Sequence, residues 1–188
     1  LGEDGYAFIQ VLDGTSNAEQ FLKFPLDAYK ADRNQFDVKI GSSSFQLEKI
    51  SLDLERPGFR IQGELEFEDV TGWPISVASP GVMGWYSWVP KMECYHGVLG
   101  FDHRISGSLS INDSELDFTD GRGYIEKDWG SAFPEGYVWM QTNHFDQPKV
   151  SLTASIAIIP WLRTTFRGFI VGLWVDGELF RFATYSGA

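Results

Sequence analysis

Cysteine is almost absent from this sequence. Cys94 is the single cysteine among 188 residues, which excludes an intramolecular disulfide framework and a cysteine-rich metal site. Three histidines are present, at positions 96, 103 and 144, but none of them lies in an HExxH or CxxC spacing. Because a zinc site needs several convergent ligands with fixed support, we predict no metal.

Other catalytic signatures are missing as well. The sequence contains no GxSxG nucleophile elbow and no phosphate-binding loop, which argues against a serine hydrolase and a nucleotide-dependent enzyme. No segment combines sustained helical periodicity with helix caps. Among enzymatic mechanisms, general acid catalysis is therefore the one that the residues support best.

Positive charge is also in short supply. The chain has 15 Lys and Arg against 26 Asp and Glu, which gives a net charge of −11. Because the acidic residues are scattered along the whole length, a nucleic-acid backbone or an anionic membrane surface is a poor partner. A neutral or apolar ligand fits this charge better.

No apolar run is typical of a membrane-spanning helix. The most hydrophobic stretch, residues 150–175, contains Pro160 and Arg167 and is interrupted by Thr and Ser, whereas a spanning helix needs about 20 predominantly apolar residues. We expect two or three buried strands there. The numbering begins at Leu1 rather than Met, so a signal or transit peptide can lie outside the sequence. We therefore make no prediction of the cellular compartment.

Short alternating segments make up most of the sequence. Residues 59–67 alternate apolar and charged side chains, as expected of a half-buried antiparallel strand, and residues 92–98 and 105–111 indicate two further strands. Asp176-Gly177, between two apolar runs, is a strong hairpin signal. With 43% hydrophobic residues, the chain is long enough to bury a core. These features predict an all-β barrel or sandwich.

Residues 73–90 break this regularity with three prolines, two glycines and the aromatic residues Trp73, Trp85, Tyr86 and Trp88. Long ordered loops in compact domains are often lids or binding loops, so this segment is a candidate wall or cover for a cavity. Sealing the end of a barrel with hydrophobic bulk explains the same composition equally well.

The densest group of candidate functional residues lies in residues 121–145. Strand alternation places Tyr124, Glu126 and Asp128 on one face. Burial disfavours the charged form of a carboxyl and raises its pKa, which would keep a proton available for transfer at neutral pH. The alternative is a solvated face whose carboxylates pair with the cations at positions 104, 122 and 127, and the residues alone favour it.

Several separated motifs resemble the tocopherol cyclase family. They are PGVMG at 80–84, MECYHGV at 92–98, the run 121–130 followed by Phe133-Pro134, WMQTNHF at 139–145, FIVG at 169–172 and RFATYSGA at 181–188. The resemblance covers most of the chain from Pro80 onward, in the order of that family. Residues 1–79 match only in general β character.

The resemblance implies an antiparallel lipocalin-like pair of β-barrels, with residues 1–133 forming the first barrel and residues 134–188 supplying strands of a second barrel that is incomplete or shared. It also implies an enzyme that closes a chromanol ring on a prenylated hydroquinone. The alkene nearest the ring is protonated, and the phenol oxygen captures the tertiary cation. This chemistry needs a proton donor in an apolar, aromatic-lined pocket and no redox cofactor.

The same resemblance implies roles for individual residues. Glu126 or Asp128 is the expected acid. The predicted pocket wall consists of Tyr124, Trp129 and Trp139, and the polar groups expected to orient the hydroquinone head are Glu93, His96, Gln141, Asn143 and His144. The expected partner is an apolar prenylated or isoprenoid ligand, reached through a peripheral membrane contact. Two alternatives are a lipocalin-like carrier that leaves such a ligand unchanged and a purely structural β domain.

Overall fold

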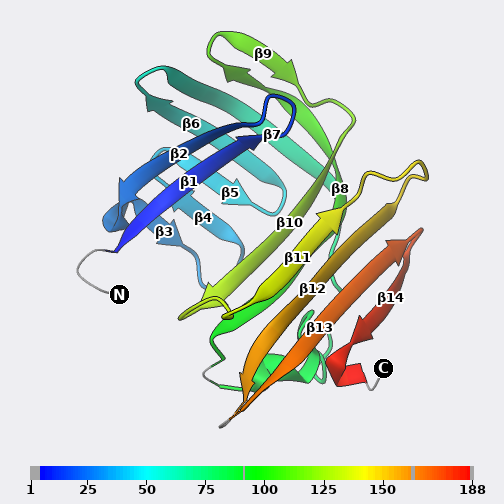
Figure 1. The fold of residues 1–188 in the computed structure, drawn as a ribbon. Helices are drawn as coiled ribbons and strands as arrows, with labels where there is room; N and C mark the ends of the chain where they lie inside the picture. Colours follow the sequence, from blue (N-terminus) through cyan, green and yellow to red (C-terminus); the bar gives the residue numbers. More distant parts are fainter. Residues whose placement is uncertain (1–4, 91, 162–163, 187–188) are drawn as a thin grey trace. The chain divides into compact units, whose positions relative to one another are not determined.

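The chain folds almost entirely into antiparallel β-structure in the computed structural model, which describes residues 5–90, 92–161 and 164–186 (Figure 1). The predicted all-β fold class is therefore confirmed. The helices in these residues are short 3₁₀ turns, η1 (Leu26–Ala28), η2 (Gly84–Trp88) and η3 (Thr184–Ser186). Within the described part of the chain, no helix is long and apolar enough to cross a membrane.

The strands of the described residues form three sheets. The first pairs β1 (Tyr6–Asp13) with β2 (Ala18–Pro25). The second has the order β10-β8-β7-β6-β5-β4-β3, with β9 beside β8, and contains β3 (Tyr29–Ala31), β4 (Asp37–Ile40), β5 (Ser43–Gln46), β6 (Lys49–Arg56), β7 (Phe59–Thr71), β8 (Cys94–Ile111), β9 (Ser114–Asp117) and β10 (Gly121–Gly130). The third has the order β11-β12-β13-β14 and contains β11 (Tyr137–Thr142), β12 (Val150–Trp161), β13 (Thr164–Val175) and β14 (Glu178–Ala183).

The chain divides into two compact units. The first consists of Leu1–Glu68 and Ile105–Gly121, and the second of Asp69–Arg104 and Arg122–Ala188. Strands β7, β8 and β10 contribute residues to both units. The barrel boundaries expected from the sequence, residues 1–133 and 134–188, stay predictions.

In the first unit, burial follows strand alternation along β7. Its buried face consists of Phe59, Ile61, Leu65 and Phe67. Gly63 lies on the same face with a φ of 142°, and an added Cβ would come within 2.3 Å of the main-chain oxygen of Ser108. Only glycine therefore fits this close strand approach. The predicted half-buried strand at residues 59–67 is confirmed.

The core of the second unit is aromatic. It consists of Trp73, Val82, Met83, Val98 and Phe101. Phe101 is fully buried and stacks on Trp73, with ring centroids 5.3 Å apart. The loop at residues 73–90 thus supplies core residues through Trp73 and Val82, while Trp85 and Trp88 stay exposed.

Strand β8 corrects one expectation. Two separate strands at residues 92–98 and 105–111 were predicted, but β8 runs without a break over 18 residues. The polar segment between them remains in the sheet because its side chains are accommodated there. Arg122 donates from Nε to Oδ1 of Asp102 at 2.9 Å, and His103 is almost fully buried. The two or three strands expected in residues 150–175 are confirmed as β12 and β13.

Candidate functional site

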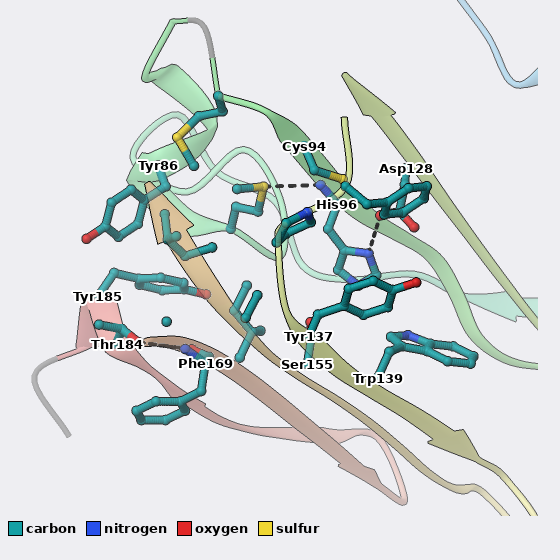
Figure 2. Close-up of a pocket in the computed structure, with 18 of the residues that line it drawn as sticks. Tyr86, Cys94, His96, Asp128, Tyr137, Trp139, Ser155, Phe169, Thr184 and Tyr185 are labelled. Carbon is teal, nitrogen blue, oxygen red and sulfur yellow. Dashed lines mark hydrogen bonds and ion pairs between the residues drawn. The ribbon is translucent and has the colours of Figure 1, made fainter. Parts of the chain in front are cut away.

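The second unit contains a cavity of about 320 Å³ (Figure 2). This volume lies at the lower end of the roughly 300–1,000 Å³ typical of small-molecule pockets. The lining residues are Met83, Tyr86, Met92, Cys94, His96, Glu126, Asp128, Phe133, Pro134, Tyr137, Trp139, Ser155, Ala157, Ile159, Phe166, Gly168, Phe169, Ile170, Thr184 and Tyr185. Most of these side chains are apolar or aromatic; the two carboxyl groups come from β10 and the imidazole comes from β8.

Strand register creates one wall of the cavity. Trp139, Ser155 and Ile170 are cross-strand partners on β11, β12 and β13, so their side chains share one face of the sheet. The next row down places Ala157 beside Gly168. The small residues Ser155, Ala157 and Gly168 in these rows leave room for the cavity, and larger aromatic side chains surround it.

Glu126 is held inside the cavity by two hydrogen bonds to the same oxygen. The Tyr124 hydroxyl donates to Glu126 Oε2 at 2.7 Å, and Trp139 Nε1 donates to it at 3.1 Å. The Tyr124 hydroxyl also lies 3.1 Å from Oγ1 of the buried Thr153. Burial raises the pKa of Glu126, and the hydrogen bonds from Tyr124 and Trp139 act in the opposite direction. Burial likewise raises the pKa of Tyr124, which remains a neutral donor.

His96 lies between the two carboxylates of β10. Its Nδ1 is 2.7 Å from Asp128 Oδ1, and its Nε2 is 3.8 Å from Glu126 Oε2. The main-chain nitrogen of His96 donates to the sulfur of Met83 at 3.1 Å. Only 15% of the His96 side chain is exposed. The His96 main chain and the His96 ring are thus each held by a contact, and β8 presents this imidazole to the acidic face of β10.

The cavity has a polar end and an apolar end. Figure 2 shows His96, Asp128 and Trp139 on one side and Tyr86 and Tyr185 on the other. At the apolar end, the Tyr86 ring packs edge-on against neighbouring aromatic rings. The Tyr185 hydroxyl donates to the main-chain oxygen of Val82 at 2.7 Å, which connects the loop before β8 to η3. An elongated ligand with a polar head would have one favoured orientation here.

Comparison with known proteins gives a family for this architecture. The profile described as tocopherol cyclase-like matches residues 33–188. The chain belongs to the tocopherol cyclase-like family. The resemblance expected from the sequence motifs is thereby confirmed, although the last two residues of the final motif, Gly187 and Ala188, lie outside the described residues.

Two plant proteins are similar to this chain. A chloroplastic tocopherol cyclase of Zea mays is 26% identical over 129 residues, which cover 66% of this chain and 27% of that protein. A probable chloroplastic tocopherol cyclase of Oryza sativa subsp. japonica is 24% identical over 129 residues, with the same coverage of both chains. The match thus spans about a quarter of the length of these relatives.

In this family member, the structure brings together half of the ten side chains predicted to form the site. Glu126, Asp128, His96 and Trp139 line the cavity, and Tyr124 contacts it through its hydrogen bond to Glu126. The two predicted acids therefore share a face, as strand alternation requires, and that face meets an apolar cavity.

The other predicted side chains are outside the cavity lining in the described part of the chain. Trp129 stacks on Tyr95, with centroids 5.5 Å apart. The main-chain oxygen of Glu93 accepts hydrogen bonds from the turn after β10. Asn143 is buried and donates to the main-chain oxygen of Gly123 at 3.1 Å. Gln141 is half-buried and His144 is exposed. Their roles in substrate binding stay predictions.

The cations considered as surface partners of the carboxylates lie elsewhere. Arg122 pairs with Asp102, Arg104 pairs with Asp69 at 3.1 Å, and the Lys127 ammonium lies 4.9 Å above the Trp129 ring. Among the described residues, the basic side chain that lies beside Glu126 and Asp128 is His96.

Some lining residues were not identified from the sequence. Ser155, Phe166 and Gly168 belong to strands that were predicted only as apolar, and Tyr185 was only part of a motif. Their places in the cavity wall follow from the register between β12 and β13, which pairs Ser155 with Ile170 and Ala157 with Gly168, and no local sequence signal gives that register. Among the described residues, no group of three or more His, Cys, Asp or Glu side chains is arranged to hold a metal ion.

Proposed function

We propose that this cavity catalyses the acid-initiated ring closure of a prenylated hydroquinone or a similar prenylated phenol, with Glu126 as the proton donor. The observation that carries the proposal is the position of Glu126, a half-buried carboxyl in an aromatic cavity. Because burial raises the pKa of Glu126, more of it carries a proton near neutral pH than for an exposed glutamate. Membership of a family whose matched relatives are named tocopherol cyclases supports the substrate class.

The proposed reaction is an isomerisation whose atoms balance without an oxidant or reductant. Glu126 gives its proton to one alkene carbon, forming a C–H bond and leaving a tertiary cation beside the new carboxylate. The phenol oxygen then forms a C–O bond to the cation and loses its own proton to a base. The product has the same composition as the substrate.

Aromatic rings are suited to the cationic intermediate of this reaction. Tyr137 and Trp139 line the cavity, and the face of an aromatic ring attracts a cation. The apolar lining also excludes water, which would otherwise capture the cation before the phenol oxygen does. The hydroquinone head belongs at the His96 end, and the prenyl chain runs toward Tyr86.

A lipocalin-like barrel is the framework that we propose around this cavity, with access for an apolar substrate through a peripheral membrane contact. Antiparallel sheets and the use of neighbouring strands β11, β12 and β13 as a cavity wall support this framework. The division into a first barrel at residues 1–133 and a second at 134–188 is part of the same proposal.

Incubation with a prenylated hydroquinone tests the proposed function directly. Products are separated by chromatography, because substrate and chromanol have the same mass. A time-dependent, protein-dependent conversion supports the enzyme. Quantitative recovery of bound, unchanged ligand after long incubation would contradict it and favour a carrier that uses the same cavity.

The pH dependence of the reaction follows from the role of Glu126. A general acid acts in its protonated form, so kcat/KM is expected to fall as the pH rises through the pKa of Glu126. Tyr124→Phe removes a hydrogen bond that favours the carboxylate, so the fall in kcat/KM should move to higher pH. A kcat/KM profile over the stable pH range measures both effects.

Tyr29→Phe is the control for this profile, because it removes the hydroxyl of an exposed tyrosine in the first unit. Its profile should coincide with that of the wild type. A shift of the Tyr124→Phe profile to lower pH, or an unchanged profile, would contradict Glu126 as the acid.

A cationic analogue should bind more tightly than a neutral one. In this analogue a protonated nitrogen replaces the carbon that carries the positive charge in the reaction. Because the intermediate resembles the transition state, we expect the ammonium compound to bind about 10²-fold more tightly than the isosteric hydrocarbon. Isothermal titration calorimetry of both compounds measures the ratio, and equal affinities would contradict stabilisation of a cation by this cavity.

A further inference from the structure

The proposed ring closure requires a base that accepts the proton of the phenol oxygen. We propose that His96 Nε2 accepts this proton and that Asp128 is the positioning residue that holds the imidazole for the task. The identity of the substrate in this inference rests on the proposed function. The contact itself, a phenol hydrogen-bonded to His96, does not require turnover.

The hydrogen bond to Asp128 selects the tautomer of His96. An ionised carboxylate only accepts hydrogen bonds, so the short contact of 2.7 Å between Asp128 Oδ1 and His96 Nδ1 places a proton on Nδ1. In the neutral ring the remaining nitrogen, Nε2, is then the acceptor. The same arrangement stabilises the imidazolium that forms when Nε2 takes up a second proton.

Four other polar side chains of the cavity, those of Cys94, Tyr137, Ser155 and Thr184, are poorer acceptors than His96. The Cys94 thiol remains protonated because burial, and then the charge of Asp128, raise its pKa. Ser155 and Tyr137 carry hydroxyls, which are weak bases, and the Thr184 hydroxyl already accepts a hydrogen bond from the main-chain nitrogen of Phe169 at 2.8 Å.

The distance between His96 and Glu126 allows the proton to return. At 3.8 Å, Nε2 and Oε2 are farther apart than a hydrogen bond, so the acid does not donate directly to the base before the substrate binds. After ring closure, Glu126 is a carboxylate and His96 carries the phenolic proton. A small side-chain movement or one bridging water then transfers the proton from Nε2 to Oε2 and restores both groups.

Binding of phenols that cannot cyclise tests this inference without turnover. The probes are a series with a saturated chain and with ring fluorines that raise the acidity of the phenol. If Nε2 accepts the hydrogen bond, affinity for the wild type should increase with acidity, by about tenfold across the series. His96→Asn keeps an amide donor toward Asp128 but lacks an acceptor at Nε2, so the affinity should become independent of acidity.

Two further variants separate a chemical role from a structural one. His96→Gln has a longer side chain that can present its amide oxygen near the position of Nε2, so it should recover part of the dependence on acidity. Asp128→Asn should weaken that dependence, because an amide accepts from Nδ1 or donates to it and no longer selects one tautomer. Equal dependence on acidity in the wild type and in His96→Asn would overturn the inference.

Turnover of an alkene-containing substrate distinguishes the inference from the proposed function. If the wild type cyclises this substrate but His96→Asn and the wild type respond equally to phenol acidity, the function stands and the inference fails. If the wild type binds the saturated phenols in an acidity-dependent, His96-dependent way but never cyclises the alkene, the phenol contact stands and the proposed function fails.

Discussion

Glu126→Gln is expected to lower the turnover of a prenylated hydroquinone by about 10²–10⁴-fold, which is the usual contribution of a general acid. The glutamine amide matches the carboxyl in shape, and its oxygen can still accept the hydrogen bonds that Tyr124 and Trp139 donate to Glu126 Oε2. It has no proton to give to an alkene. Binding of a saturated analogue should therefore persist while kcat falls, and chromatographic rate measurements together with titration calorimetry separate the two quantities.

Glu178→Gln is the matched control, since it makes the same chemical change at an exposed residue at the start of β14. Its kcat should equal that of the wild type. Asp128→Asn is expected to have a smaller effect than Glu126→Gln, because Asp128 accepts a hydrogen bond from His96 rather than donating a proton. Wild-type turnover by Glu126→Gln would show that the acid has been assigned wrongly.

Strand alternation alone placed Tyr124, Glu126 and Asp128 on one face, and the side-chain contacts of Glu126 are those of such a face. Alternation does not say what packs against that face. The charged residues on this face favoured exposure to solvent, because a charged side chain is costly to bury without a partner. The family resemblance favoured a position of this face inside a barrel. In the structure, Glu126 and Asp128 line the cavity, and the His96 ring lies beside them.

The hydrogen bond between His96 and Asp128 could not be predicted from the sequence. The two residues are 32 positions apart, and their contact depends on the register between β8 and β10. A shift of one residue in that register would turn the imidazole to the opposite face. No local pattern in MECYHGV carries this information. The unbroken course of β8 was missed for a related reason, since the pairing of Asp102 with Arg122 is another contact between distant segments.

Small residues of the cavity wall were equally hard to identify. Gly168 and Ala157 look unremarkable within apolar strands, and their role as spacers emerges only when cross-strand neighbours are known. An added Cβ at Gly168 would lie 2.9 Å from Cγ1 of Ile159. Strand type was therefore predictable from local alternation, whereas cavity shape depends on pairings that are distant in the sequence.

Phe101→Ala is expected to cause the largest loss of stability. The Phe101 ring is fully buried and stacks between Trp73 at 5.3 Å and Trp174 at 6.2 Å. Truncating a buried phenylalanine to alanine costs about 3–5 kcal/mol, because apolar contacts are lost and a void remains. For a chain of this size, that cost corresponds to a decrease in Tm of about 6–20 °C. Thermal unfolding followed by near-ultraviolet circular dichroism of the tryptophans measures it.

The same substitution links the core to the cavity, because Met83 belongs to the core that includes Phe101 and also lines the cavity. Phe101→Ala should therefore weaken the binding of a saturated prenylphenol even at temperatures where the protein is folded. Phe180→Ala is the control, since Phe180 is 42% exposed on β14 and its loss should change Tm by a few degrees at most. Equal Tm values for Phe101→Ala and Phe180→Ala would mean that the stacked aromatic rings do not hold the second unit together, and the cavity wall would need another source of rigidity.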